Sequence, residues 1–319
     1  MSSIPKLQVP PLPSQPLAGT PADSVPPFGS ASRELFRTCN NQRSFFFKHD
    51  LRDNPLMSLP SLLELSRRQP QKPAFAHWSN GKVGVDDHWD AGQGPRYTLQ
   101  ETIANIENNN SLVLLKHVQE DPVYRPFIHS VFERVIDLAG PAMRDDILRG
   151  RGTVLIASPR RLTSYHIDSD LNYLFQIAGD KWFSVFDHND RTLTTHQELE
   201  QFFSGNINSA VFKEGRQKEA SLYDLRAGYG VHVPCFAAHW AQNRDTPSIA
   251  LSINWDLRSI TRLGRIYRFN GKLRRRGWQP TPPGESAWRD ALKIAGLDGL
   301  NLARRLAGRG GQAPKTMNS

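Results

Sequence analysis

Apolar and polar positions follow two different spacings along the chain, and the spacing changes near residue 150. Before this point, three segments repeat apolar residues every three or four positions, which is typical of amphipathic helices. Short apolar runs between them favour strands. The expected helices are 59–68, 98–107 and 121–139, and the expected strands are 44–48, 74–78 and 111–117. Ser61 and Thr98, each followed three residues later by Glu, are the expected N-caps of the first two helices.

Beyond residue 150 the chain breaks into short strand-like runs, most of them separated by Gly, Pro, Asn or Asp. Seven such runs are 152–157, 162–167, 171–178, 181–187, 220–225, 230–234 and 248–255. So many short strands in succession favour a closed or sandwiched antiparallel β unit. Residues 193–212 interrupt the series as an insertion, with a helix expected near 197–203.

The two ends of the chain differ from this middle part. Residues 1–30 contain eight prolines and little apolar surface to offset the entropy of ordering, so we expect a flexible arm. The segment 262–276 is basic with interleaved apolar residues, and a Pro-rich break separates it from helices expected at 286–295 and 300–306. We therefore divide the chain into an arm, an α/β region, a β core and a basic helical tail, at 1–30, 31–149, 150–256 and 257–319.

The net charge of +9 comes from the tail. From Arg258 onward, 14 Lys and Arg stand against 3 Asp and Glu, which gives +11, and the other residues carry 26 against 28, which gives −2. This distribution excludes a uniformly basic nucleic-acid-binding protein. Nucleic acid is therefore an unexpected partner, although the tail can contact an anionic one.

Composition also bounds the location of the protein. Hydrophobic residues make up 38% and charged residues 22%, and no run approaches the ~18 consecutive apolar residues that a membrane span needs. The sequence does not start with a basic segment followed by an apolar one, so we expect no secretory signal. Cys39 and Cys235 are too few for a disulfide framework. A cytoplasmic protein without membrane contact is the expectation.

The strongest candidate chemistry is a His-x-Asp pattern on a predicted strand. Positions i and i+2 of a strand point to the same face, so the imidazole and the carboxylate project together. The pattern occurs three times, as His88 with Asp90, His166 with Asp168 and His188 with Asp190. Only the second opens a strand–turn–strand unit with an apolar-lined face, because the first lies in a Gly- and Asp-rich loop and the third in a turn.

A second histidine, distant in sequence, would complete a face of two histidines and one carboxylate for a divalent metal. This ligand set is typical of non-haem Fe(II) oxygenases. His232, beside Pro234, is expected to pack at the end of its strand, whereas an antiparallel neighbour can bring His239 opposite His166. The alternative, a set of unrelated polar residues on a β-sandwich, stays open from these residues alone.

Residues 163–181 and 230–255 resemble the JmjC/cupin-type 2-oxoglutarate oxygenases, and among them the asparaginyl hydroxylase that inhibits the hypoxia-inducible factor. The region before residue 150 resembles them only in outline. The resemblance implies a mainly β fold with flanking helices, built on a double-stranded β-helix (jelly-roll) core. An N-terminal α/β region and a C-terminal helical tail would flank this core.

The resemblance also implies roles for individual residues. His166, Asp168 and His239 occupy the positions of the family's Fe(II) ligands. Lys181 and Thr163 match the residues that bind the 5-carboxylate of 2-oxoglutarate as a charge-assisted pair.

Two amides complete the set of expected site residues, and a nearby tyrosine is not part of it. Asn172 and Asn254 match family amides that lie near the 1-carboxylate of 2-oxoglutarate or the O2. Tyr165, one residue before His166, would point to the opposite face and is not expected in the site.

As the leading function, the resemblance implies hydroxylation of a peptide or protein side chain, with release of succinate and CO2. It also implies a homodimer that forms through the C-terminal helices. A small-molecule oxygenase is the first alternative, and a lysine demethylase is the second. A non-catalytic metal cupin, with the basic tail as its anion-binding part, is an alternative of a different class.

Overall fold

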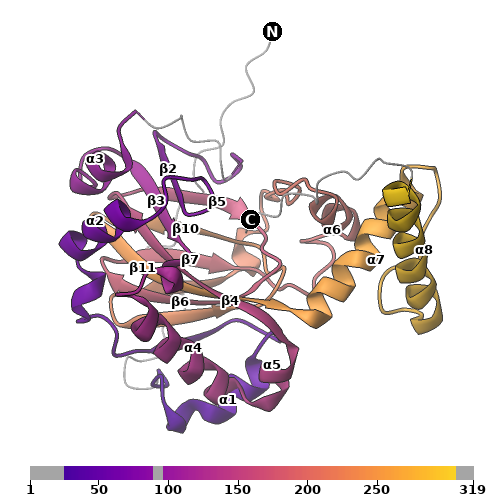
Figure 1. The fold of residues 1–319 in the computed structure, drawn as a ribbon, viewed down its shortest axis with the longest axis horizontal. Helices are drawn as coiled ribbons and strands as arrows, with labels where there is room; N and C mark the ends of the chain where they lie inside the picture. The colour runs from indigo at the N-terminus through magenta and orange to yellow at the C-terminus, as the bar shows by residue number, and fades with distance from the viewer. Residues whose placement is uncertain (1–24, 89–95, 307–319) are drawn as a thin grey trace.

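The computed structural model describes residues 25–88 and 96–306, and two antiparallel sheets form its centre (Figure 1). Eight consecutive strands are shared between these sheets. The seven-stranded sheet contains β4 (Ile147–Ala157), β6 (Leu171–Ala178), β9 (Tyr229–Val233) and β11 (Ser248–Leu257), and the four-stranded sheet contains β5 (Leu162–His166), β7 (Lys181–Val185), β8 (Ser221–Leu225) and β10 (His239–Asn243). The chain changes sheet after nearly every strand, which confirms the expected double-stranded β-helix. β10 was not among the seven strands that the sequence predicted.

Three further strands widen the seven-stranded sheet. β3 (Ser111–Lys116) pairs with β4, β2 (Ala76–Asn80) pairs with β3, and β1 (Phe45–Lys48) pairs with β9 at the opposite edge. β1 and β3 lie within one residue of the expected runs, whereas β2 begins two residues later than expected. β3 and β4 therefore lie side by side, and their inner faces form one continuous surface.

Five helices accompany these strands in the described part of the N-terminal region: α1 (Arg33–Cys39), α2 (Leu59–Arg68), α3 (Leu99–Ala104), α4 (Arg125–Ala139) and α5 (Pro141–Asp146). The sequence predicted α2, α3 and α4 but not α1 or α5. The expected N-cap of α2 is wrong, because Ser58 is the cap and its side chain accepts a hydrogen bond from the Ser61 N–H. Pro60 in the first turn is compatible with a helix that begins at Leu59, as predicted. The capping box of Thr98 and Glu101 at α3 is confirmed.

Most of the apolar core lies outside the space between the two sheets. On the outer face of the seven-stranded sheet, Phe132 of α4 contacts Trp255, and Phe36 of α1 stacks on Tyr173 with ring centroids 5.6 Å apart. Figure 1 shows α1, α4 and α5 together on one side of the sheets. The space between the sheets holds a smaller apolar cluster, which consists of Leu174, Phe183, Val185, Leu225, Val231, Val233, Ala237, Ala241 and Ala250. The rest of this inner space is free for polar side chains.

The expectation of a flexible arm is wrong for its last residues. Pro27 forms a bridge with Lys48 of β1, and the Phe28 N–H donates to the Lys48 carbonyl at 2.6 Å. The Phe28 side chain is 2% exposed and lies against Phe175. Burial of this one aromatic ring offsets the ordering entropy that the composition alone did not account for. Residues 1–24 of the expected arm lie outside the described residues.

The C-terminal region forms a helical unit beside the sheets (Figure 1). α7 (Arg258–Arg274) continues directly from β11, α6 (His196–Phe203) packs on it, and α8 (Ala287–Leu306) packs on its other side. The two helices expected at 286–295 and 300–306 are one helix, α8. Gly296 does not interrupt it, because a Cβ there would lie 3.0 Å from the Phe269 ring of α7, and glycine permits this close approach. No helix within the described ranges is long and apolar enough to cross a membrane.

Candidate metal centre

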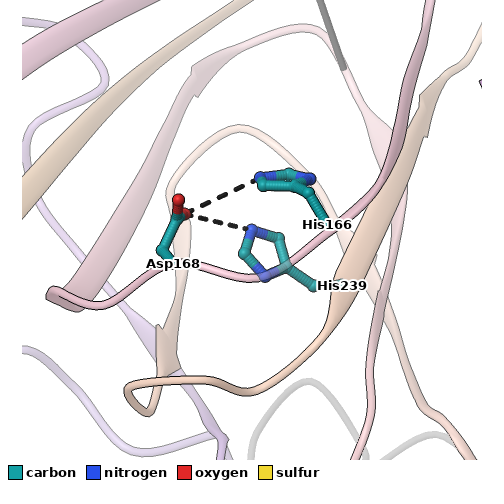
Figure 2. A group of neighbouring side chains, drawn as sticks. All are labelled: His166, Asp168 and His239. Carbon is teal, nitrogen blue, oxygen red and sulfur yellow. Dashed lines mark ion pairs between the residues drawn. The ribbon is translucent and has the colours of Figure 1, made fainter. Parts of the chain in front are cut away.

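His166, Asp168 and His239 come together where β5 ends and β10 begins (Figure 2). His166 and His239 are register partners in the antiparallel pair of β5 and β10, and Asp168 follows two residues after His166. The Nε2 atom of each histidine lies 3.7 Å from Asp168 Oδ2, and the two imidazole centroids are 4.2 Å apart. The structure thus assembles the three side chains that the sequence selected.

Backbone groups fix the orientation of both imidazoles. His166 Nδ1 lies 2.7 Å from the Ser164 carbonyl, and His239 Nδ1 lies 2.9 Å from the Ala237 carbonyl. Each Nδ1 therefore donates a proton to a backbone carbonyl, and each Nε2 faces Asp168. A hydrogen bond to the ring nitrogen that does not bind metal is the usual way in which proteins orient a histidine ligand.

The electrostatics of the three groups call for a cation between them. Burial lowers the pKa of His239 to about 3, so this imidazole is neutral at pH 7 and the 3.7 Å contact is not an ion pair. Burial also raises the pKa of Asp168, against the opposing effects of His166 and Arg151. Asp168 Oδ1 is buried and has no hydrogen-bond donor within the described residues. Two histidine nitrogens and a carboxylate oxygen on one face fit a divalent transition metal.

A cavity of about 130 Å³ opens beside this triad. Its walls come from β3, β4, β5 and β11, and they include Thr163, His166, Asp168 and Asn254 of the expected site residues. The remaining lining residues are Leu112, Leu114, Lys116, His117, Arg151, Thr153, Leu155, Asp170 and Ser252. The cavity is therefore apolar at one end and strongly polar near the triad.

The two expected amides face each other across β6 and β11. Asn172 and Asn254 are register partners, and Ser252 connects their side chains. Asn172 Nδ2 donates to Ser252 Oγ at 2.5 Å, and Ser252 Oγ donates to Asn254 Oδ1 at 2.8 Å. Ser252 was not predicted as a site residue, although its position two residues before Asn254 places both side chains on one face of β11.

Lys181 lies deep in the space between the sheets. It opens β7, its inward-facing neighbour is Phe183, and it is four residues before Val185, the register partner of His239. At about 3.3 Å per residue, Lys181 is roughly 13 Å along the strand from the level of the triad. The residue is 6% exposed, and burial lowers its pKa to about 8. No carboxylate of the described chain comes within ion-pair distance of its ammonium group.

Arg151 lines the cavity beside the triad and was not predicted from the sequence. It is the register partner of Asn254 on β4, and its guanidinium binds Asp170 at 2.9 Å and Asp256 at 2.7 Å. The Arg151 side chain is 6% exposed and that of Asp170 is 1% exposed, so this ion pair is buried beside the triad. An arginine in a short Gly-Arg-Gly run gives no local signal, because its burial depends on the register between β4 and β11.

The competing histidines lie outside the triad. His232 is fully buried on the outer face of the seven-stranded sheet, where its Nδ1 bonds to the Asn172 carbonyl at 2.9 Å and its Nε2 accepts from the Asn41 N–H at 3.0 Å. Its expected structural role is confirmed. His188 lies in a turn after β7, and His88 is exposed. Asp90, the partner of His88 in the pattern, lies outside the described residues.

Tyr165 also lies where the strand alternation placed it. Its ring contacts Phe186 and Phe212, with centroids 5.4 Å away in each case, on the outer face of the four-stranded sheet. The tyrosine therefore cannot reach the cavity that Thr163 and His166 line.

No protein-family model matches the sequence, and no curated protein is similar to it at the level of sequence. Among solved structures, Escherichia coli YcfD is similar with a TM-score of 0.44 and 12% identity, over 83% of this chain and 65% of that chain. The ribosomal oxygenase YcfD with cobalt and 2-oxoglutarate gives 0.43 and 12%, over 83% and 64%. Lactobacillus farciminis oxalate decarboxylase gives 0.22 and 18%, over 33% and 23%. The chain thus spans about 65% of the length of YcfD.

Proposed function

We propose that the chain is an Fe(II)- and 2-oxoglutarate-dependent oxygenase that hydroxylates a C–H bond of a peptide or protein side chain. One observation carries the proposal. A buried triad of two histidines and one aspartate lies at one level of a jelly-roll interior, and Lys181, a buried cation without a counter-charge in the described chain, lies at another. A site of this kind fits a metal chelated by one end of a ligand whose other end is a carboxylate.

The chain's own residues would hold the metal and the co-substrate in fixed positions. His166, Asp168 and His239 would bind Fe(II), with both imidazoles oriented by backbone carbonyls. Lys181 and Thr163 would bind the 5-carboxylate of 2-oxoglutarate, which restores the charge balance around the lysine. When bound, the metal and 2-oxoglutarate supply the oxidative decarboxylation to succinate and CO2 that is coupled to hydroxylation.

The polar row across β6 and β11 would position the groups next to the metal. The side chain of Ser252 receives a hydrogen bond from Asn172 and gives one to Asn254, so the orientation of each amide depends on the other. Leu112, Leu114 and Leu155 form the apolar part of the cavity wall. Apolar walls exclude water, which strengthens each charge-assisted contact inside the site.

A peptide or protein substrate is our leading choice because of the resemblance of residues 163–181 and 230–255 to the asparaginyl hydroxylase. A small-molecule oxygenase uses the same metal chemistry and remains the alternative. The non-catalytic alternative, with the tail as the functional part, is less favoured because several tail cations already have partners. Arg274 binds Glu200 at 2.7 Å, and Arg265 binds Asp298.

We also propose that two copies of the chain associate through α8. This helix exposes Trp288, Leu292 and Leu302, which are 64%, 62% and 59% exposed and recur on one side of the helix. An apolar stripe of this kind is typical of a helix that packs against a partner. A cytoplasmic location accords with Cys39 and Cys235, which are both free and buried.

The visible absorption of the protein under anaerobic conditions tests the proposed function. Fe(II) is added first and 2-oxoglutarate second, with His166→Ala as the control variant. We expect a charge-transfer band that appears only in the wild type and only after 2-oxoglutarate is added. Iron binding without this band would contradict the role of 2-oxoglutarate, and the absence of iron binding would contradict the metal site.

A further inference from the structure

Lys116 lies at the polar end of the cavity, where the proposed function gives it no role. It is the last residue of β3, it lines the same cavity as His166 and Asp168, and its register partner on β4 is Thr153. From its sequence, Lys116 is only part of a predicted strand, because its inward direction follows from the pairing of β3 with β4.

The backbone around Lys116 is held on both sides of the strand. Its N–H donates to the Phe75 carbonyl at 2.7 Å, and its carbonyl accepts from Gln69 Nε2 at 2.8 Å. Gln69 is itself 6% exposed. These contacts fix the backbone at the end of the strand, where the Lys116 side chain lines the cavity.

The surroundings of Lys116 disfavour its charge in the ligand-free protein. The side chain is half-buried, and burial together with the nearby positive charge of Arg151 lowers its pKa. No carboxylate within the described ranges lies at ion-pair distance from its ammonium group. A desolvated cation beside another cation is unfavourable unless an anion joins them.

The carboxylates near Lys116 are paired with arginines and are therefore not available to Lys116. Asp170 binds Arg151, and Asp256 binds both Arg151 and Arg149. In the proposed holoenzyme, Asp168 faces the metal, and Lys181 takes the 5-carboxylate of 2-oxoglutarate. Lys116 is then the cation of the described cavity wall whose charge stays uncompensated.

Lys116 and Lys181 also lie at different depths, so one carboxylate group cannot serve both. Lys116 is the register partner of Thr153 on β4, and Thr153 is in turn the register partner of Ser252 on β11. Ser252 is the inward-facing residue next to Asn254, so Lys116 lies close to the level of the triad. Lys181 follows the end of β6 at Ala178, whereas Asn172, beside the triad, lies at the start of the same strand. The co-substrate carboxylate belongs to the deep lysine, and the lysine near the triad faces the part of the cavity where a substrate must reach the metal.

We infer that the substrate is an acidic peptide, and that Lys116 pairs with a carboxylate close to the residue that is hydroxylated. The inference rests on the proposed function, since it places the substrate in the cavity next to the metal. Thr153 and Asn254 add polar contacts on the same wall. The carboxylate would hold the reacting C–H bond near the triad, and a neutral amide of the same shape would be held less well.

The test compares two pools of capped, fluorescently labelled hexapeptides that differ only at one fixed position, which is Asp in one pool and Asn in the other. Their affinities are measured by fluorescence anisotropy for the anaerobic protein loaded with Fe(II) and 2-oxoglutarate. We expect the wild type to bind the Asp pool about tenfold more tightly, as one charge-assisted contact of about 1.4 kcal/mol implies. Equal affinity for the two pools, or no measurable binding of either, would overturn the inference.

Three variants show whether Lys116 causes the preference. Lys116→Met should remove it, Lys116→Arg should keep it, and Lys218→Met, at an exposed position far along the chain, should leave it unchanged. A preference that persists in Lys116→Met would also overturn the inference. The charge-transfer band of the Fe(II) and 2-oxoglutarate complex is recorded for each protein. If the wild type shows no band, the proposed oxygenase function itself is wrong, and not only the role of Lys116.

Discussion

Replacement of Lys181 by methionine should change two measurable properties in opposite directions. Methionine has nearly the length of lysine without its charge, so the change removes the ammonium group and leaves the packing close to intact. Burial lowers the pKa of Lys181 from 10.5 to about 8, which corresponds to about 3 kcal/mol of folding free energy at neutral pH. The ligand-free Lys181→Met variant should therefore be more stable than the wild type.

The pH dependence of this difference has a defined sign. The unfolded chain binds the lysine proton more tightly than the folded chain, so the wild type carries the full penalty below pH 8. The penalty fades as the pH rises from about 8 through 10.5, and it is absent at higher pH, where the lysine is neutral in both states. The difference in the free energy of unfolding between variant and wild type should shrink over that range, as urea unfolding at several pH values would measure.

Binding of 2-oxoglutarate should move the other way. Loss of one member of a buried charge pair costs about 2–5 kcal/mol, which is a loss of affinity of roughly 30-fold to several thousand-fold. Titration of the charge-transfer band with 2-oxoglutarate measures this loss, and Lys218→Met serves as the matched control. A variant that is less stable, or one that binds 2-oxoglutarate as well as the wild type does, would refute the assignment of Lys181 as the carboxylate-binding residue.

Three further substitutions test other parts of the structure. Asp168→Asn should raise the free energy of unfolding of the metal-free protein by about 1–3 kcal/mol, because the buried carboxylate has an oxygen without a donor in the described chain. The same change should abolish iron binding. Urea unfolding in the presence of a chelator measures the first effect, and metal analysis measures the second. Arg151→Met should lower the free energy of unfolding by about 3–5 kcal/mol, since it leaves the buried Asp170 unpaired; a loss below about 1 kcal/mol would contradict the role of this ion pair. The double change of Trp288 and Leu292 to Glu should convert a dimer to a monomer by light scattering, with the charge-transfer band unchanged; a wild type that is monomeric at micromolar concentration would contradict the association through α8.

The sequence predicted those site residues whose placement depends on local periodicity. His166 and Asp168 share a face because they are two residues apart, and Tyr165 points away for the same reason. The resemblance then selected Lys181 and Asn254, which lie on inner faces of the two sheets, and their roles stay predictions. Each of these placements needs only the strand alternation and a motif at a fixed spacing.

The residues that were missed depend on pairing between strands far apart in sequence. Arg151 reaches the site because it is opposite Asn254 in the register of β4 and β11, and Lys116 because β3 extends the sheet next to Thr153. No local pattern encodes such a register. The same holds for the end of the arm, where Phe28 is buried only because Phe36 and Phe175 surround it.

The location of the core explains how the protein tolerates so many charges between its sheets. The largest buried side chains, such as Trp255, Tyr173 and Phe36, lie outside the inner space, and they stabilise the fold without filling it. The inner space buries both Asp168 and Lys181, and burial disfavours the charged form of each side chain. Each charge is relieved only when a ligand of opposite charge binds. Metal and co-substrate should therefore stabilise the folded protein more than their contacts alone would, because binding also removes a penalty that the ligand-free fold carries.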